Sequence, residues 1–415
     1  MKNLEKVQIS AVWINALGSE RRQRLRSPSL SILILLECPS VPSGQHKVVV
    51  RAVSRMLPNQ PYFGAISQVQ TSYLDYGQIK TWLENCEMAH ELCKKTYPTR
   101  PMHSFRVIDV EQDCVVDAPD HCRFCALSYV WGDTCQLQLT RANSSHMKQK
   151  GALREVPLAL TIRDAIECTR GLGERYLWVD SLCIVQDSDE IRQQCIDDMS
   201  KIYAHSLLTI VAATCRSANE PLPGVSSKRT WQQWHQEVSP NLTICAQFDS
   251  KDYLQNTTYN TRAWTYQEYQ LANRLLIFSP NGQVYFSCKC AMHSEEVMPG
   301  ANLESDAAML EGAMSSRLQF DHGMLWSTYR SMIEEYTKRS MRREHDILNA
   351  LTGILNTLVD SRHIAGLPFA IFDMALLWQP RQRLRRRRGF PSWSWAGWVG
   401  QIHWFDDGCL DTQKG

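Results

Sequence analysis

The order of strand-like and helix-like segments between residues 105 and 213 limits the folds open to this chain more than any other feature. Short segments rich in β-branched and aromatic residues alternate there with longer amphipathic segments. The strand-like segments are 105–110, 124–131, 176–180 and 207–213, and the helical ones are 157–173 and 188–206. Because parallel strands need such crossovers, the order predicts an α/β fold with a mainly parallel sheet flanked by helices.

Other segments extend this pattern on both sides. Residues 76–97 place apolar side chains on one helical face, and residues 261–288 suggest a helix, a strand, a turn and a second strand. Two more amphipathic helices are expected at 324–339 and 346–358, with a Trp-rich segment, 389–400, after them. We therefore expect helices and a Trp-rich C-terminal segment to be added to the α/β core.

The length of 415 residues exceeds what one ordinary core organises. We divide the chain into an N-terminal extension at 1–75, an α/β core at 76–300 and a helical, Trp-rich C-terminal region at 301–415 that packs on the core. A polar segment of weak periodicity, 216–260, is expected to be an insertion in the core.

Charge and cysteine usage narrow the class of protein. A net charge of +2 gives no reason to expect nucleic-acid binding. The 15 cysteines form no regular framework and follow no secretion signal, so we expect reduced thiols in a cytoplasmic protein. The apolar run 30–36 is far shorter than the roughly 20 residues of a membrane-spanning helix and is interpreted as a strand.

An arginine-rich run at 381–388 and a tryptophan-rich block follow one another near the C-terminus. The run is expected to be exposed and mobile, as a solvated loop, or alternatively to serve nuclear import or an anionic surface. In the block, strand-like alternation places Trp393 and Trp395 on one face. We expect both, with Trp398, to be largely buried against the α/β core.

Polar residues stand where the strands are expected to end. Asp180 follows the apolar segment Tyr176–Val179, and Asp133 follows Trp131 at the end of another strand. Ligands of open α/β sheets bind beyond the carboxyl ends of the strands. Asp180 is therefore expected to face a cleft or to cap the loop that follows it.

The same segments resemble the three sequence blocks of the fungal heterokaryon-incompatibility (HET) domain. The blocks are "ALSYVWGD" (126–133), "YLWVDSLCIVQDS" (176–188) and "TRAWTYQEYQLANRLLIF" (261–278), and "PSWSWAGW" (391–398) resembles a C-terminal continuation of the family. The resemblance covers roughly residues 76–400. It implies a fungal protein of non-self recognition and regulated cell death, distantly similar to Toll/interleukin-1-receptor (TIR) domains, with a TIR-like or Rossmann-like core.

The likeness to TIR domains also implies a candidate site. In TIR enzymes that cleave NAD, a glutamate in a W-x-x-x-E helix is catalytic, and Trp264 and Glu268 have that spacing here. Glu268 would stabilise the oxocarbenium-like ribose, since the nicotinamide is already cationic and leaves without a general acid. Trp131 or Trp264 would stack on a ring of NAD, and Asp133 and Asp180 would bind ribose hydroxyls.

Two functions remain open at this point. The protein is either a NAD glycohydrolase that uses NAD as its substrate and needs no cofactor, or a non-catalytic module that signals by self-association. Its partners would be further copies of itself or other cell-death proteins. In a purely structural alternative, Glu268 pairs with Arg262 or Arg274, and the tryptophans belong to the core.

The cysteines and histidines suggest no metal site. Cys122 and Cys125 form one C-x-x-C pair, whereas structural zinc needs four converging ligands, usually from two such pairs. Two further groups are close in sequence: Cys86, His90 and Cys93 on one helical face, and Cys288, Cys290 and His293. We expect no metal, and we interpret Cys183 as a packing thiol.

Overall fold

The structure is a computed structural model. It describes residues 8–13, 31–37, 45–53, 72–94, 105–229, 235–239, 242–248, 254–296, 325–359 and 362–405.

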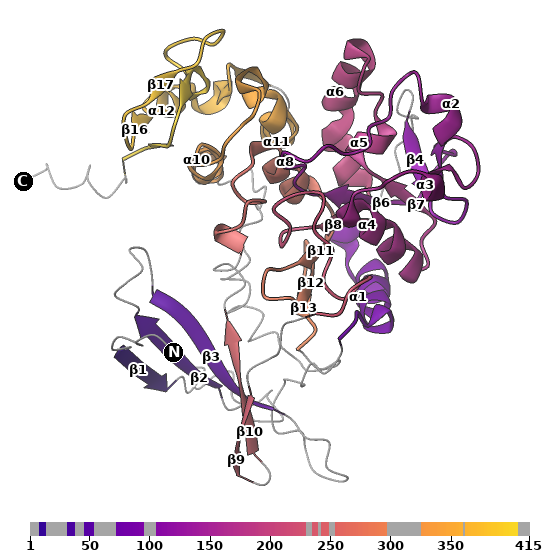
Figure 1. Ribbon diagram of the computed structural model, residues 1–415. Helices are drawn as coiled ribbons and strands as arrows, with labels where there is room; N and C mark the ends of the chain where they lie inside the picture. Colours follow the sequence, from indigo (N-terminus) through magenta and orange to yellow (C-terminus); the bar gives the residue numbers. More distant parts are fainter. Residues whose placement is uncertain are drawn as a thin grey trace, which may run out of the picture.

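An eight-stranded sheet forms the centre of the fold (Figure 1), in the order β13-β12-β11-β8-β6-β7-β4-β5. Its strands are β4 (Arg106–Asp109), β5 (Cys114–Asp117), β6 (Phe124–Ser128), β7 (Tyr176–Trp178), β8 (Leu208–Val211), β11 (Arg274–Phe278), β12 (Val284–Cys288) and β13 (Met292–Ser294). The four central strands, β11, β8, β6 and β7, are parallel. The strands at both edges of the sheet pair antiparallel with their neighbours. The predicted α/β class is confirmed, and the sheet is mixed, with parallel strands only at its centre.

Helices cover the two faces of this sheet. The main ones are α1 (Tyr76–Ala89), α4 (Leu160–Gly171), α6 (Asp189–His205) and α8 (Ala263–Leu271), with the short α5 (Asp180–Cys183) directly after β7. Side chains alternate between the faces of a strand. In β6, Ser128 bonds to Glu268 of α8, whereas Cys125 lies near enough to Cys168 of α4 to affect its pKa. Therefore α8 and α4 lie on opposite faces.

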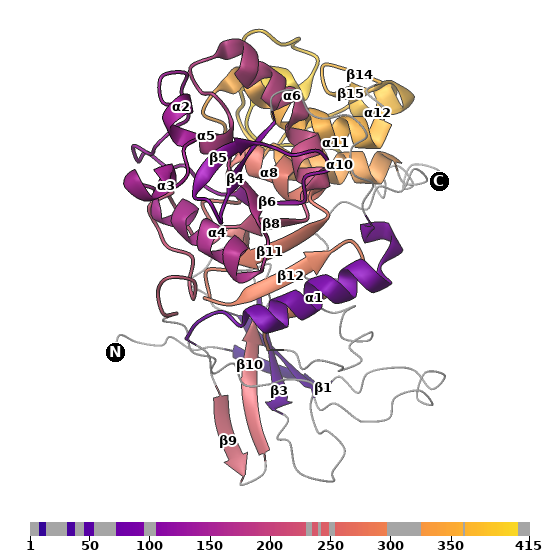
Figure 2. The ribbon, with the colours of Figure 1, turned by 90° about the vertical axis from the view of Figure 1, so that its right-hand side faces the viewer.

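Helix α1 shares the face of α4. A Cβ placed on Gly171 in α4 would lie only 2.6 Å from the ring of Tyr76, which begins α1. Figure 2 shows α1 running across β12, and the rings of Trp82 in α1 and Phe286 in β12 are 6.4 Å apart. Helix α1 ends at Ala89, earlier than the predicted 97, and a single 3₁₀ turn, Glu91–Cys93, follows it.

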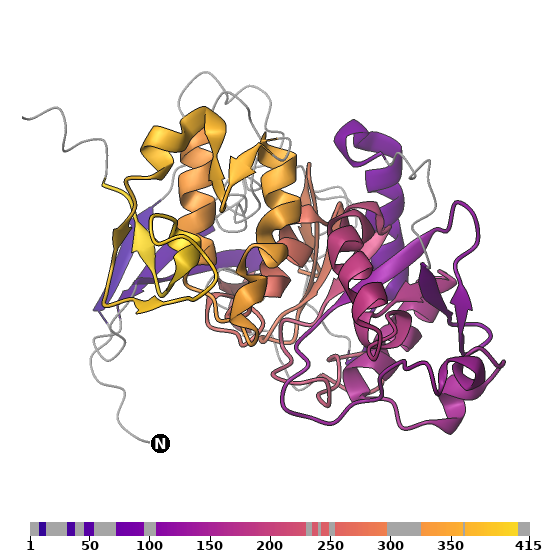
Figure 3. The same cartoon turned by 90° about the horizontal axis from the view of Figure 1, so that it is seen from above.

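Helices α8, α6 and α11 (Asn349–Val359) pack against one another, each in contact with the other two. Figure 3 shows this part of the molecule from above, with the orange α11 beside the magenta α6. The contact with α11 is close because Gly353 has no side chain. A Cβ there would lie 2.2 Å from Cβ of Ser200 in α6, and the Gly353 N–H donates to Oε1 of Gln267 at 2.8 Å. The close approach holds α8 firmly against its neighbours.

The C-terminal region forms a second hydrophobic cluster with α8. It joins α10 (Leu325–Tyr336) and α11 to Trp395, which is 1% exposed and donates its indole N–H to the Tyr329 hydroxyl at 3.0 Å. The expected strand alternation is wrong here, because Trp395–Gly397 form a 3₁₀ turn. Consequently Trp393 is 39% exposed, and Trp395 packs among helices rather than against the main sheet.

The arginine run is also more ordered than the sequence suggested. Arg385 and Arg386 form the short strand β17, which pairs with Trp398 and Val399. The side chain of Arg387 is buried and donates two hydrogen bonds of 2.7 Å to the carbonyl oxygens of Ala396 and Trp398. The expectation of an exposed, mobile loop is wrong for Arg387, because the neighbouring tryptophan block offers backbone acceptors that a solvated loop would lack.

A second, five-stranded antiparallel sheet has the order β1-β2-β3-β10-β9 and lies at the lower end of the molecule in Figure 1. It combines β1 (Gln8–Trp13), β2 (Ser31–Glu37) and β3 (Gln45–Val53) with β9 (His235–Ser239) and β10 (Leu242–Phe248). The strand predicted at 30–36 is confirmed. The supposedly irregular insertion 216–260 contributes two strands, since β10 pairs with β3.

No helix in the described ranges is long and apolar enough to cross a lipid bilayer. The domain limits drawn from the sequence stay predictions, and the limit at residue 300 lies outside the described residues.

Candidate functional site

A polar cluster lies where the central strands end, on the face of the sheet that α8 covers. We define it as Ser128, Trp131, Asp180, Tyr259 and Glu268. Ser128 ends β6, Asp180 begins α5 just after β7, and Glu268 lies within α8. The parallel pairing of β6 with β7 brings their carboxyl ends to the same edge of the sheet.

Asp180 is held by donors from both sides. Its Oδ2 accepts the indole N–H of Trp131 at 2.8 Å, and its Oδ1 accepts the backbone N–H of Ser181 at 2.6 Å. The hydroxyl of Tyr129 donates to Oγ of Ser181 at 3.0 Å and thus supports the same turn. These bonds fix the orientation of the half-buried carboxyl group at the tip of β7.

Glu268 is buried, with 7% of its surface exposed. Its Oε2 accepts a hydrogen bond of 2.5 Å from the Ser128 hydroxyl. The Ser128 oxygen in turn lies 2.6 Å from the hydroxyl of Tyr259. When Glu268 is ionised, Tyr259 donates to Ser128 and Ser128 donates to the carboxylate, so the two hydroxyls form a chain that ends on Glu268.

Burial raises the pKa of both carboxyl groups in the cluster. It raises the pKa of Glu268 to about 7, and the negative charge of Asp180 adds to this effect, while the hydrogen bond from Ser128 opposes it. Burial raises the pKa of Asp180 to about 6 against the hydrogen bonds from Trp131 and Ser181. The positive charge of Arg262 lowers the pKa of both groups. Carboxyls that titrate near neutrality can take up or release protons at physiological pH.

The structure brings together three of the residues singled out in the sequence. Trp131 and Asp180 are hydrogen-bonded, and the charge of Asp180 acts on Glu268. Trp264 is half-buried and packs between the two large hydrophobic clusters. Asp133 is exposed and takes no part in the hydrogen bonds recorded for the cluster.

In the purely structural alternative, Glu268 would pair with Arg274 or Arg262. The hydrogen bonds of Arg274 do not include Glu268. Arg274 points instead to the opposite face, where its guanidinium donates to Cys86 Sγ and to the backbone oxygen of Cys93. Arg262, at the start of α8, acts on Glu268 through its charge, and no ion pair joins the two among the described residues.

Sequence reasoning missed Ser128 and Tyr259. Ser128 had a signal, because it is the polar residue that ends the apolar strand Phe124–Ser128. Tyr259 lies in a loop just before the sequence block 261–278, and its contact with β6 is visible only in three dimensions.

Comparison with known protein families found one match. The family model described as heterokaryon incompatibility protein (HET) matches residues 124–268, from the first residue of β6 to Glu268 itself. No curated protein and no solved structure matches the chain. The match encloses Ser128, Trp131, Asp180 and Tyr259 as well as Glu268. Residues 124–268 of this chain therefore form a heterokaryon-incompatibility (HET) domain.

Proposed function

We propose that this HET protein acts in fungal non-self recognition and regulated cell death, and that its polar cluster does so by cleaving NAD. The observation that carries the proposal is the meeting of Glu268 with Asp180 and Trp131. These residues come from three separate segments, and Glu268 has a pKa raised to about 7. Burial disfavours the ionised form of a carboxyl group, so burying Glu268 contributes little to the stability of the fold. A TIR-like ancestry of the core belongs to the same proposal.

The reaction is hydrolysis of the bond between nicotinamide and ribose. The electron pair of the breaking C–N bond passes to nicotinamide, which leaves as a neutral molecule. The carboxylate of Glu268 stabilises the positive charge that develops on the ribose. Water then bonds to the same carbon, and its proton passes to Glu268, whose pKa of about 7 suits a general base at neutral pH. The products are ADP-ribose, nicotinamide and a proton.

The other site residues bind the substrate in this proposal. Asp180 and Asp133 accept hydrogen bonds from ribose hydroxyls, and Trp131 or Trp264 stacks on a ring of NAD. Because only 7% of Glu268 is exposed, substrate must reach it after a rearrangement that uncovers the cluster. That requirement fits an effector that is inactive until a recognition event opens it.

The test is incubation of the full chain with NAD, followed by chromatography of released nicotinamide. It is run at low protein concentrations, which keep the chain monomeric, and at high ones, which drive it to assemble. Glu268→Gln keeps the shape and removes the charge, so the rate is expected to fall by roughly 10²–10³. Glu155→Gln is the matched control, because Glu155 is exposed in a short helix. Absence of nicotinamide release by the wild type in every assembly state would refute NAD cleavage.

A second candidate function is signalling by self-association without catalysis. Large apolar side chains are exposed in the C-terminal region, among them Phe369, Leu377 and Phe405, at 59%, 68% and 63%. Such exposure favours a contact surface. If this function holds, Leu377→Glu abolishes assembly, measured by light scattering, together with cell killing, whereas Glu268→Gln leaves both unchanged. If the Glu268→Gln variant still assembles but no longer kills cells, signalling without catalysis is excluded.

A further inference from the structure

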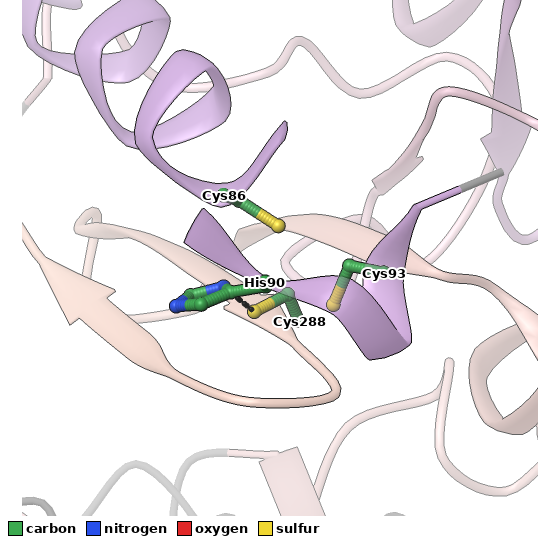
Figure 4. A group of neighbouring side chains, drawn as sticks. All are labelled: Cys86, His90, Cys93 and Cys288. Carbon is green, nitrogen blue, oxygen red and sulfur yellow. Dashed lines mark hydrogen bonds between the residues drawn. The ribbon is translucent and has the colours of Figure 1, made fainter. Parts of the chain in front are cut away.

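Three cysteines and one histidine gather on the face of the sheet opposite Glu268. Figure 4 shows the Sγ atoms of Cys86, Cys93 and Cys288 and the imidazole of His90 turned toward one another between α1 and β12. One ligand atom from each residue lies within 4.8 Å of all the others. The three cysteines are buried and His90 is half-buried. A set of four soft donors in one place is the composition of a structural zinc site.

The backbone explains why these four side chains meet. Cys86 lies in the last turns of α1, and His90 caps the helix with its N–H bonded to the Cys86 carbonyl oxygen. The chain then turns once in 3₁₀ form to bring Cys93 back toward the sheet. Cys288, the last residue of β12, supplies the fourth donor, with its Sγ 3.3 Å from Nδ1 of His90.

The spacing of the donor atoms is close to that of a bound zinc ion. With zinc–sulfur bonds of about 2.3 Å, two sulfur ligands of a tetrahedral site lie about 3.8 Å apart. The limit of 4.8 Å means that side-chain adjustments of about 1 Å would complete the tetrahedron.

Hydrogen bonds to the sulfur atoms favour thiolates. Sγ of Cys288 accepts the backbone N–H of Cys290 at 3.4 Å and of Ala291 at 3.2 Å. Nε of Arg274 donates to Sγ of Cys86 at 3.1 Å. Backbone and guanidinium donors aimed at sulfur orient the ligands of a metal site and stabilise their negative charge.

The charge of Arg274 provides an independent argument. Its side chain is 1% exposed, and its recorded hydrogen bonds go to sulfur and to the carbonyl oxygens of Leu207 and Cys93. Among the described residues, no carboxylate forms a recorded ion pair with it. A buried guanidinium needs a counter-charge. Three thiolates, one neutral imidazole and one Zn²⁺ carry a net charge of −1, which balances Arg274.

We propose that Cys86, His90, Cys93 and Cys288 bind one Zn²⁺ in a closed structural site. Four protein ligands leave no open position, so this site holds the fold rather than catalyses. It joins α1 to the β12–β13 hairpin across 198 positions of sequence between His90 and Cys288. Through Arg274 it also contacts the start of β11, the strand that directly follows α8.

Neighbouring residues that the sequence grouped with these ligands lie outside the set. His293 stacks on the ring of Trp82, with centroids 5.9 Å apart. Cys290 is exposed, with its Sγ 3.9 Å from that of Cys93. The C-x-x-C pair, Cys122 and Cys125, contributes no ligand atom. The sequence-based expectation of no metal followed from searching for paired motifs, whereas the candidate ligands come from one helix end and a distant strand.

The first test measures metal in the full chain, purified without chelator, by plasma mass spectrometry. We expect about one zinc per chain. Replacing zinc with cobalt(II) is expected to give the thiolate-to-cobalt charge-transfer band and the visible bands of a tetrahedral site. Alkylation before and after removal of the metal is expected to show that Cys86, Cys93 and Cys288 are protected only while the metal is bound.

Variants separate a ligand from a residue that only packs. Cys288→Ser is expected to lower the zinc content to below about 0.2 per chain, while Cys135→Ser, an exposed control outside the site, keeps it. His90→Ala is expected to weaken zinc binding, and His90→Cys is expected to retain about one zinc by forming a Cys₄ site. The His90 pair keeps the test decisive even if the Cys288 variant fails to fold.

Three results would overturn the proposal. The first is a wild-type chain that holds less than about 0.2 zinc even after zinc is supplied. The second is a disulfide between any two of the three cysteines, seen as a mass lower by two hydrogens in the non-reduced chain. The third is unchanged zinc in both Cys288→Ser and His90→Ala. None of these results depends on whether Glu268 cleaves NAD.

Discussion

At the scale of single residues, Glu268 combines burial with ionisation in a way that stability measurements can detect. Its pKa rises from 4.5 to about 7 on folding, chiefly through burial. The folded protein therefore binds this proton more tightly than the unfolded chain does. The resulting contribution to stability is fully present below pH 4.5 and is lost as the pH rises through 7.

We expect Glu268→Gln to remove this pH dependence. Between pH 4.5 and pH 8, the free energy of unfolding of the variant should rise relative to that of the wild type by up to about 3 kcal/mol. Urea unfolding at pH values across this range measures the difference, with Glu155→Gln as the exposed control. A constant difference between variant and wild type would mean that Glu268 titrates in the folded protein as it does in the unfolded chain.

At the scale of elements, the sequence located most segments because their apolar periodicity is strong. The pattern predicted the helices α4 and α6 and the strands β6, β7 and β8 within a few residues of their ends. The short elements were less predictable. In the sequence, Trp395–Gly397 look like part of an alternating strand, but they form a 3₁₀ turn in which the Ser394 side chain accepts the N–H of Ala396. Packing against α10 and α11 then decides which tryptophan is buried.

The arginine run provides a prediction at this scale. Arg387→Ser would leave the carbonyl oxygens of Ala396 and Trp398 without their buried donor, which is expected to lower the free energy of unfolding by roughly 2–4 kcal/mol. Arg388→Ser, at an exposed neighbouring position, should change it by less than about 0.5 kcal/mol. Chemical unfolding of the two variants decides. Equal, small effects would restore the interpretation of the whole run as a solvated loop.

At the scale of the whole molecule, the C-terminal segment and the HET domain share a hydrophobic cluster through α8. Trp395, Ile402 and Trp404 pack there with Tyr266 and Leu271 of that helix. The region after the matched residues 124–268 is therefore in contact with the helix that carries Glu268. A change in the C-terminal region has a direct physical route to the polar cluster.

We expect a chain that ends at residue 388 to be strongly destabilised. It loses two buried tryptophans, Trp395 and Trp404, and removal of each such side chain typically costs about 3–5 kcal/mol. Calorimetry should show a much lower melting temperature, or no cooperative transition, for the shortened chain. The replacement Trp393→Ala in the full chain, at a side chain that is 39% exposed, is the mild comparison. Identical melting of the shortened and full chains would identify the segment as a separate appendage.

The sequence by itself determined the α/β class and the order of the main elements. It also placed Asp180 at the end of an expected strand and Glu268 within an expected helix. Those features are local, since periodicity and the alternation of segments record them along the chain. Only the tertiary structure decided which side chains share a face. It joined Ser128 and Tyr259 to Glu268, and it brought Cys288 to His90 from 198 positions away. Such contacts depend on strand order and helix packing, which no local pattern encodes.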